Sequence, residues 1–228
     1  MNKYKILRKE NPIKISDFAT ISKEYDISLK KKKRYEKARW ASQEGMMNRF
    51  KLAHKLLSTI EYDNILDIGC GTGDMFKVIN NRKKKYFAYD LNFNMVLYAK
   101  KSSGNNVRYF NASSKPIPVK SGSIDVVTLV GVLQNCGIQT NEFIKEISAI
   151  LRAGGHLFLI TKNLGWHKFA EAKLRPDKDH NWFFDSEISG ELINNGFDIV
   201  LKSGFLNRSG RLADIEKSHE IFYWARKK

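Results

Sequence analysis

From residue 64 onward, the chain alternates short β-rich runs with helical patterns, and this alternation constrains the fold more than any other feature. Strands that alternate with helices are typical of βαβ units, which build a parallel sheet. The fourth run is unbroken and apolar, as expected for a central strand buried on both faces. We therefore predict an α/β fold with strands at 64–69, 85–90, 107–112, 124–132 and 156–162, and helices at 74–81, 94–101 and 141–151.

The flanking regions depart from this alternation. Upstream, residues 15–58 have mainly helical patterns. The glycines of "RAGG", 152–155, are expected to end the helix before them. In the C-terminal region, a helix is predicted at 187–195, capped by Asp185 or Ser186 and ended by Gly196. Two β-rich runs, "FDIVLKSGF" and "SHEIFYWARK", follow without a clear helix between them, so an antiparallel pair is the simplest expectation.

Composition limits where the chain can act. The hydrophobic content of 42% over 228 residues can form one sizeable core. No apolar run reaches the roughly 18 to 20 residues of a membrane span. The segment "MNKYKILRKENPIK" lacks the apolar centre of a secretory signal, and the two cysteines, Cys70 and Cys136, lie far apart. These features predict a cytoplasmic protein with reduced thiols.

The charge balance points to anionic partners. The net charge is +16, and five consecutive basic residues run from Lys30 to Arg34. Nucleic acid, a membrane surface or a phosphorylated substrate would each be attracted by such a charge. The lysines are scattered, however, so a lysine-rich composition without any partner accounts for the same balance.

The most informative stretch is "ILDIGCGTGDM", 65–75. Asp67 is close to the end of the first strand, and Gly69, Gly71 and Gly73 follow before a helix begins. The glycines allow a sharp turn and a close approach of a ligand to the backbone, and the helix N-terminus offers free N–H groups. A second acid, Asp90, ends the second strand, where a carboxylate can accept hydrogen bonds from both hydroxyls of an adenosine ribose.

These glycines exclude two common nucleotide motifs. The dinucleotide pattern G-x-G-x-x-G fails because Asp74 follows Gly73, and the Gly-Lys-Ser/Thr of a P-loop is absent. The "DIGCGTG" element followed by Asp90 resembles the class I S-adenosylmethionine-dependent methyltransferases, of the small-molecule type that includes the methyltransferase-11 and ubiquinone-biosynthesis-like groups. The resemblance covers roughly residues 61–162.

The resemblance implies a fold and a cofactor. The expected sheet is seven-stranded and Rossmann-like, mostly parallel with an antiparallel last strand, and helices cover both faces. Residues 1–58 would form a helical cap or lid packed on a methyltransferase domain at 59–228, in a single globular unit. S-adenosyl-L-methionine would be the cofactor, S-adenosyl-L-homocysteine the product, and no metal is expected.

The resemblance also implies the cofactor-binding residues. Asp67 and the glycine loop would hold the methionine moiety, and Asp90 the ribose. Asn111 replaces the acid that this family usually has after the third strand, and its amide oxygen can still accept a hydrogen bond from the adenine amino group. The expected set is Asp67, Gly69, Cys70, Gly71, Gly73, Asp90, Leu91, Asn92, Asn111, Ala112, Val130, Tyr25 and Arg39.

Part of this set comes from the N-terminal segment. "DFATISKEYD", 17–26, is similar to a stretch that precedes the core in small-molecule methyltransferases, where the tyrosine lies over the cofactor; here it is Tyr25. Arg39 would pair with the cofactor carboxylate, although a solvated helix face is the alternative. With Tyr35 and Trp40, these residues are candidates for a lid.

The acceptor site is less constrained. A hydroxyl acceptor usually needs a general base, most often histidine, and His167 and His180 both lie in the insert after the fifth strand. The aromatic residues of that insert either wall an acceptor pocket or anchor the loop to the core. The expected substrate-contacting residues are Gln134, Asn135, Tyr35, Trp40, Trp166 and Trp182.

Three functions fit these features. The favoured one is methyl transfer to a small anionic acceptor, such as a sugar or a phosphorylated or nucleotide-linked intermediate. A tRNA or rRNA methyltransferase is the second, but the fourth strand is followed by "LQNCG" and not by Asp/Asn-Pro-Pro-Tyr, and no proline–cysteine pattern surrounds Cys136. A non-catalytic partner protein with the cofactor fold is the third. The sequence does not determine the oligomeric state.

Overall fold

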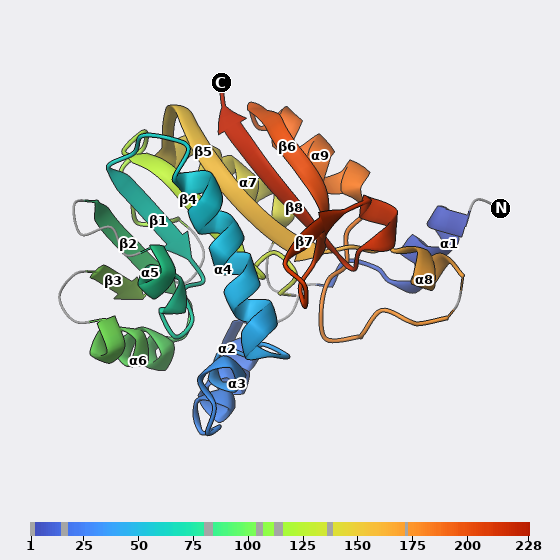
Figure 1. The fold of residues 1–228 in the computed structure, drawn as a ribbon, viewed down its shortest axis with the longest axis horizontal. Helices are drawn as coiled ribbons and strands as arrows, with labels where there is room; N and C mark the ends of the chain where they lie inside the picture. Colours follow the sequence, from blue (N-terminus) through green and yellow to red (C-terminus); the bar gives the residue numbers. More distant parts are fainter. Residues whose placement is uncertain are drawn as a thin grey trace.

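A single sheet of eight strands forms the centre of the molecule (Figure 1). The computed structural model describes residues 3–14, 18–79, 84–103, 107–111, 116–135, 139–171 and 173–228. Along the sheet the strand order is β3-β2-β1-β4-β5-β8-β6-β7. The strands are β1 (Asn64–Ile68), β2 (Lys85–Asp90), β3 (Val107–Asn111), β4 (Ile124–Val130), β5 (Leu151–Lys162), β6 (Phe197–Leu206), β7 (Arg211–Ala213) and β8 (Glu220–Lys227).

Strand direction confirms the predicted topology with one addition. Strands β1 to β5 pair in parallel, and β8 is antiparallel between β5 and β6. The predicted count of seven strands is wrong, because the described chain contains an eighth, β7. Gly210, with φ at +70°, lies at the turn that folds this three-residue strand back along β6.

Helices cover both faces of the sheet, as predicted (Figure 1). Helices α4 (Gln43–Leu57) and α5 (Asp74–Ile79) pack on one face with β-strand residues such as Ile65. Helices α7 (Thr140–Ile150) and α9 (Asp185–Asn194) pack on the opposite face with the next residue, Leu66. This alternation follows the pleat, because successive strand side chains point to opposite faces.

The segment "RAGG" does not end a helix as predicted. Helix α7 ends at Ile150, and β5 begins at the next residue, so 152–155 already belong to the strand. Gly154 has φ at +73°, a conformation that glycine adopts easily. The first residues of β5 are therefore irregular, and this is why their composition resembles that of a turn. The C-terminal helix begins at Asp185, with Phe184 at its N-cap position.

The remaining helices lie around the sheet edges. Helix α6 (Phe93–Ser103) contacts β3, and α2 (Phe18–Leu29) contacts both α6 and α3 (Arg34–Lys37). On the other side, α1 (Lys3–Glu10) contacts α8 (His167–Ala170) (Figure 1). A short 3-10 helix spans Ile215–Lys217. In the described part of the chain, no helix is long and apolar enough to cross a membrane.

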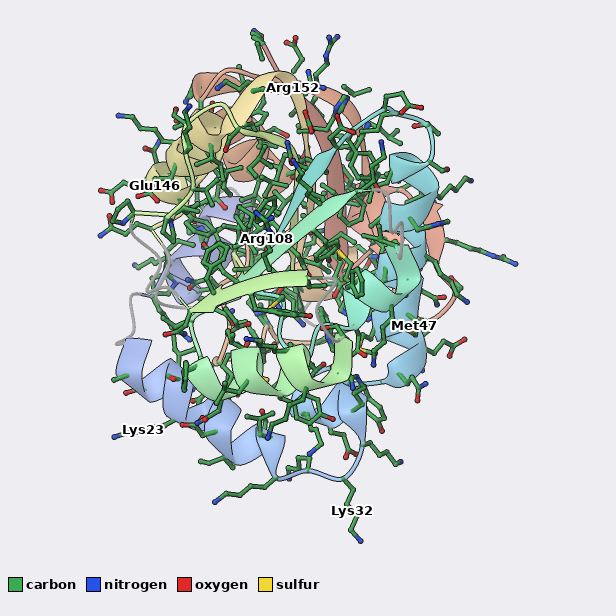
Figure 2. All side chains as sticks on the ribbon, turned by 90° about the vertical axis from the view of Figure 1, so that its left-hand side faces the viewer. Lys23, Lys32, Met47, Arg108, Glu146 and Arg152 are labelled. Atoms are coloured by element: carbon green, nitrogen blue, oxygen red, sulfur yellow. The ribbon has the colours of Figure 1, made fainter. Side chains whose placement is uncertain are left out.

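The basic run between α2 and α3 divides into two parts. Residues Lys30 to Lys33 are exposed, and Figure 2 shows Lys32 pointing away from the sheet. Arg34 instead turns inward, where its guanidinium donates to the Asp74 carboxylate and to the Thr72 carbonyl oxygen. The last residue of the run therefore ties α3 to the segment that follows the glycine loop.

Helix α4 is fixed to the sheet by a buried ion pair. Arg49 Nε donates to Glu220 Oε2 over 3.0 Å, a second guanidinium nitrogen reaches the other carboxylate oxygen, and both side chains are 5% exposed. The Arg49 guanidinium carbon also lies 4.6 Å from the centre of the Trp40 ring. The ion pair thereby supports the segment that enters α4.

Candidate functional site

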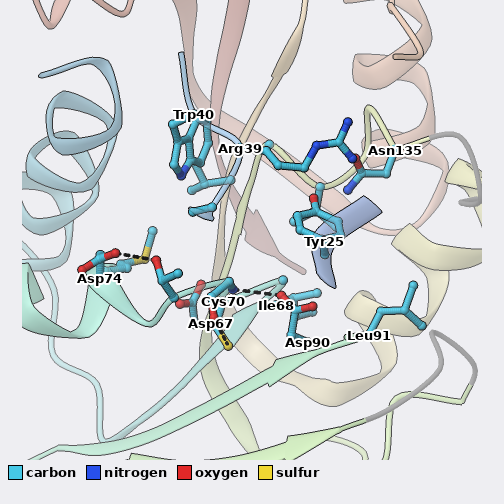
Figure 3. Close-up of a pocket in the computed structure, with 18 of the residues that line it drawn as sticks. Tyr25, Arg39, Trp40, Asp67, Ile68, Cys70, Asp74, Asp90, Leu91 and Asn135 are labelled. Atoms are coloured by element: carbon cyan, nitrogen blue, oxygen red, sulfur yellow. Dashed lines mark hydrogen bonds between the residues drawn. The ribbon is translucent and has the colours of Figure 1, made fainter. Parts of the chain in front are cut away.

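The main pocket lies at the carboxyl ends of β1, β2 and β4 and is covered by residues from α2 and from the segment 38–40 (Figure 3). Parallel strands place their carboxyl ends at one edge of the sheet, where α/β proteins generally bind ligands. The register pairs Asp67 with Ala88 and Ile68 with Tyr89. The ends of β1 and β2 are therefore level, which brings Asp67 and Asp90 to one pocket.

Asp67 is a buried carboxylate with two donors. Its side chain accepts hydrogen bonds from Thr128 Oγ1 over 2.9 Å and from the Tyr86 hydroxyl over 3.0 Å, and the residue is 3% exposed. Burial raises the pKa of Asp67 to about 7, although both hydrogen bonds act in the opposite direction. A cation bound in the pocket would favour the ionised form.

Asp90 joins the glycine loop to β2 (Figure 3). Gly71 N–H donates to Asp90 Oδ2 and Asn92 N–H donates to Oδ1, each over 2.9 Å. Burial raises the pKa of this carboxyl group above its ordinary value. Each oxygen has lone pairs beyond the single backbone hydrogen bond it accepts, so the carboxylate can still receive hydroxyl donors from a ligand.

The glycine loop needs glycine for two different reasons. A Cβ on Gly69 would lie 2.5 Å from Val132 Cγ2, and one on Gly73 would lie 2.7 Å from the Tyr109 hydroxyl oxygen; both residues have positive φ. These two positions allow the turn to pack. At Gly71, also with positive φ, the nearest atom to such a Cβ is 3.7 Å away, so the backbone there is open to a ligand.

Residues 25, 39 and 40 close the pocket from the N-terminal side. The Arg39 guanidinium carbon lies 5.3 Å from the centre of the Tyr25 ring, and Asn135 hydrogen-bonds the tyrosine hydroxyl. Figure 3 shows the side chains of Tyr25, Arg39 and Asn135 turned toward one another. Burial, with the Asp90 charge, raises the pKa of Tyr25 to about 12. The tyrosine therefore stays a neutral donor at physiological pH.

Arg39 is held in an unusual backbone conformation. Its φ is +59°. Among the residues that the structure describes, Arg39 is the one non-glycine residue with positive φ. Arginine rarely adopts this left-handed region, which costs on the order of 1 kcal/mol or more. Such strain gathers at functional sites, and here it sets the direction of the chain between Tyr25 and Trp40.

The predicted cofactor residues fall into two groups in the structure. Nine line the pocket, namely Tyr25, Arg39, Asp67, Gly69, Cys70, Gly71, Asp90, Leu91 and Val130. Gly73, Asn92 and Asn111 do not line it. The Asn92 amide donates to Ser22 and Asp26 and so fixes α2, while the Asn111 amide donates to the carbonyl oxygens of Asp90 and Leu91. Ala112 and Cys136 lie outside the described residues.

The predicted acceptor residues also divide. Trp40, Gln134, Asn135 and His180 line the main pocket. His167 does not, and its Nδ1 lies 2.9 Å from the Glu216 carbonyl oxygen. The other aromatic residues pack elsewhere: Tyr35 against the core beside α4, and Trp166 and Trp182 in a small cluster with Phe169.

Several pocket residues were not predicted. Gly131 follows β4 with φ at +70°, and a Cβ there would lie 2.8 Å from Trp40 Cη2, so this glycine makes room for the indole ring. The predicted strand, 124–132, includes this glycine, whereas β4 ends just before it, at Val130. Thr72, Asp74 and Phe143 also line the pocket. In the sequence, Asp74 marks only the break in the glycine pattern and the start of the predicted helix at 74–81.

Known proteins share both the sequence pattern and the fold. Residues 66–159 match the methyltransferase domain family. The malonyl-[acyl-carrier protein] O-methyltransferase of a Marinomonas species is 28% identical over 114 residues, which are 48% of this chain and 42% of that protein. The ubiquinone/menaquinone biosynthesis C-methyltransferase of Campylobacter jejuni is 26% identical over 102 residues, 42% of this chain and 43% of that protein.

The fold comparison extends further along the chain. A crystal structure of an S-adenosylmethionine-dependent methyltransferase from Methanosarcina mazei superposes with a TM-score of 0.62 at 18% identity, over 76% of this chain and 96% of that chain. This chain matches less than half the length of the two curated relatives. The match of residues 66–159 to the methyltransferase domain family, together with the fold, supports an assignment to the class I S-adenosylmethionine-dependent methyltransferases.

Proposed function

We propose that this protein transfers a methyl group from S-adenosylmethionine to a small anionic acceptor. The observation that carries the proposal is the pair of buried carboxylates, Asp67 and Asp90, on either side of a glycine loop whose backbone at Gly71 is open. One carboxylate suits the cationic methionine part of the cofactor. The other suits the ribose hydroxyls.

The residues around the pocket fit this cofactor. Asp67 would hold the amino group, Arg39 the carboxylate and Asp90 the ribose, while Leu91 would contact the adenine. When bound, the cofactor supplies a methyl group on a cationic sulfur, and transfer forms the bond to the acceptor while the old carbon–sulfur electron pair remains on sulfur. The protein's tasks are to align the acceptor and exclude water, which suits a pocket closed by Tyr25 and Trp40.

A small acceptor is favoured over RNA by the direction of the basic run. Lys30 to Lys33 point to solvent, and Arg34 is used to anchor α3 on Asp74. Tyr25, Arg39 and Trp40 cover the pocket from the same end of the molecule. The exposed lysines therefore form a flank beside the lid, and a nucleic acid bound there would contact charge without entering the pocket.

Two measurements test the proposal. Isothermal titration with S-adenosylmethionine should show binding by the unaltered protein, and absence of binding would contradict the proposed cofactor. Incubation with methyl-labelled cofactor and fractionated cell extract should place the label in small molecules. Label in RNA, together with a tRNA gel shift that survives about 150 mM salt, would favour the nucleic-acid alternative.

A further inference from the structure

A second cavity lies beside the main pocket, and His180 lines both. Its walls come from α1, from the segment Asn11–Lys14, from the end of α8 and from residues 174–182. We propose that this second cavity binds the methyl acceptor, that the acceptor is an amphipathic anion with a hydroxyl group, and that His180 receives the hydroxyl proton. This assignment rests on the proposed function and adds a site and a substrate class to it.

Asn181 ties the second cavity to the main pocket through both its backbone and its side chain. Asn181, 1% exposed, donates its backbone N–H to the Gln134 carbonyl oxygen over 2.7 Å. Its side chain accepts from Lys14 N–H over 2.9 Å and donates to the Lys14 carbonyl oxygen over 3.1 Å. Gln134 lines the main pocket. The insert and the N-terminal segment are therefore fixed beside the cofactor site, with His180 at the junction.

The cavity lining has an apolar floor and a charged rim. Leu7, Phe169 and Trp182 are each less than 9% exposed and form one cluster, and Leu174 at the rim is 46% exposed. These side chains suit an apolar body such as an aromatic ring.

The rim carries the charge that would hold an anion. Arg175 and Lys178 are exposed, and within the described ranges neither forms an ion pair with a carboxylate. The rim acids are Glu10 and Asp177, and Asp177 is already paired with His180. A carboxylate or phosphate on the acceptor would find two free cations at this rim.

His180 is oriented by Asp177. Nδ1 of the histidine lies 2.7 Å from Asp177 Oδ1, and the pKa of Asp177 is lowered by this hydrogen bond and by nearby Lys162, despite partial burial. An ionised carboxylate only accepts, so Nδ1 carries the proton and Nε2 is left as the acceptor. The acceptor hydroxyl would donate to Nε2 and transfer its proton there as its oxygen is methylated, which leaves a neutral methyl ether and a protonated histidine. Asp177 is then a positioning residue.

The site is tested by filling the cavity. Ala170 lines it, so Ala170→Trp should block acceptor binding, while Ala153→Trp places the same bulk on an exposed residue of β5. The probes are 3,4-dihydroxycinnamate, an aromatic acid with hydroxyl groups, and glucose 6-phosphate, a polar anion. Binding to protein saturated with S-adenosylhomocysteine is measured by ligand-detected NMR and calorimetry.

We expect the aromatic acid to bind, with its Kd raised at least tenfold by Ala170→Trp and unchanged by Ala153→Trp. Failure of the aromatic acid to bind, or binding that Ala170→Trp leaves unchanged, would overturn the assignment. Preference for the sugar phosphate would overturn the apolar part of it. A protein that binds no S-adenosylmethionine would instead contradict the proposed function, so the two failures are distinguishable.

The dyad is tested without turnover. In nitrogen-15 spectra, the His180 ring should show a protonated Nδ1 and an unprotonated Nε2, and Asp177→Asn should shift the ring toward the other tautomer while Asp177→Glu restores it. If the ratio of the two His180 tautomers stays the same when Asp177 is replaced, the positioning role is overturned. Where a probe is methylated, Asp177→Asn should lower kcat with KM unchanged, and His180→Gln should lower kcat by roughly 100-fold or more.

Discussion

The main pocket and the second cavity are built in different ways. In the main pocket, Asp67 and Asp90 lie at the carboxyl ends of neighbouring strands, and buried donors and backbone N–H groups hold them. The second cavity joins segments that lie 167 residues apart at the Lys14–Asn181 contact and 174 apart at the hydrogen bond from Arg8 to the Trp182 carbonyl oxygen. One site is fixed by the sheet and the other by a few side-chain tethers. Cofactor binding should therefore survive changes that open the second cavity.

The largest effect is expected from Asp90→Ala. This change removes the acceptor for Gly71 N–H and for the proposed ribose hydroxyls. Each hydrogen bond to a charged group contributes about 1.5–3 kcal/mol, so the Kd for S-adenosylmethionine should rise on the order of 100-fold in calorimetry. Asp198→Ala is the matched control, because Asp198 forms only an exposed pair with Lys228. A change of less than about fivefold would show that the sheet edge does not hold the cofactor.

The second prediction concerns pH and the Asp67 carboxyl group, whose pKa burial raises to about 7. Binding of a cationic group needs the ionised form, so affinity for S-adenosylmethionine should weaken as the pH falls below 7, by up to about tenfold per unit. The free energy of unfolding of the ligand-free protein should instead increase as the pH falls. The folded state binds more protons than the unfolded state between about pH 4 and 7, so unfolding becomes easier as the pH rises through this window.

Asp67→Asn isolates the contribution of the Asp67 carboxyl group to the pH dependence from that of the other titratable groups. The variant cannot ionise, so the pH dependence of both the Kd and the Tm should flatten between pH 5 and 7 relative to the unaltered protein. Asp90→Ala retains Asp67 but removes a second buried carboxyl group, whose own pKa is raised and whose charge raises the pKa of Asp67, so the pH dependence of the Tm should be reduced but not abolished. An unchanged slope in Asp67→Asn would assign the titration to another group.

A third prediction separates the two sites directly. Asn181→Ala removes both side-chain hydrogen bonds to Lys14, so amide hydrogen exchange should speed up in residues 11–14 and 174–182 and stay unchanged in 64–75. The Kd for S-adenosylmethionine should stay within about twofold, while the Kd for the aromatic acid probe should rise roughly tenfold. Asn195→Ala, which loses only a hydrogen bond to the Glu191 carbonyl oxygen within α9, is the control. Loss of cofactor binding in Asn181→Ala would show that the sites are not independent.

The same contrast explains what the sequence could predict. The strand positions follow from apolar runs, and parallel strands in register bring Asp67 and Asp90 together wherever the loops go. The eighth strand was missed because Arg211–Ala213 has no strand pattern of its own and forms by pairing with β6. The "RAGG" segment was assigned to a helix end because glycine composition does not reveal that a strand starts at Leu151.

Residues outside the motifs were harder to assign. His167 and His180 lie in the same insert, yet of the two only His180 lines the main pocket. The difference arises from the Asn181 contacts with Gln134 and Lys14, which are long-range and have no local signature. The basic run was ambiguous for the same reason, since only its last residue, Arg34, finds a buried carboxylate.

The smallest expected effect concerns Arg39. This residue has a strained backbone conformation, and its side chain is proposed to bind the cofactor. Arg39→Ala and Arg39→Gly remove the same side chain, including its contacts with Tyr25 and Glu24, so both should weaken S-adenosylmethionine binding equally. They differ in the backbone, because glycine adopts φ of +59° without strain and alanine does not. Arg39→Gly should therefore be the more stable of the two by roughly 1 kcal/mol, or about 2–4 °C in Tm. Equal melting temperatures would mean that residue 39 relaxes once its side chain is removed, so that the side-chain contacts, and not the adjoining chain, impose the conformation of the lid.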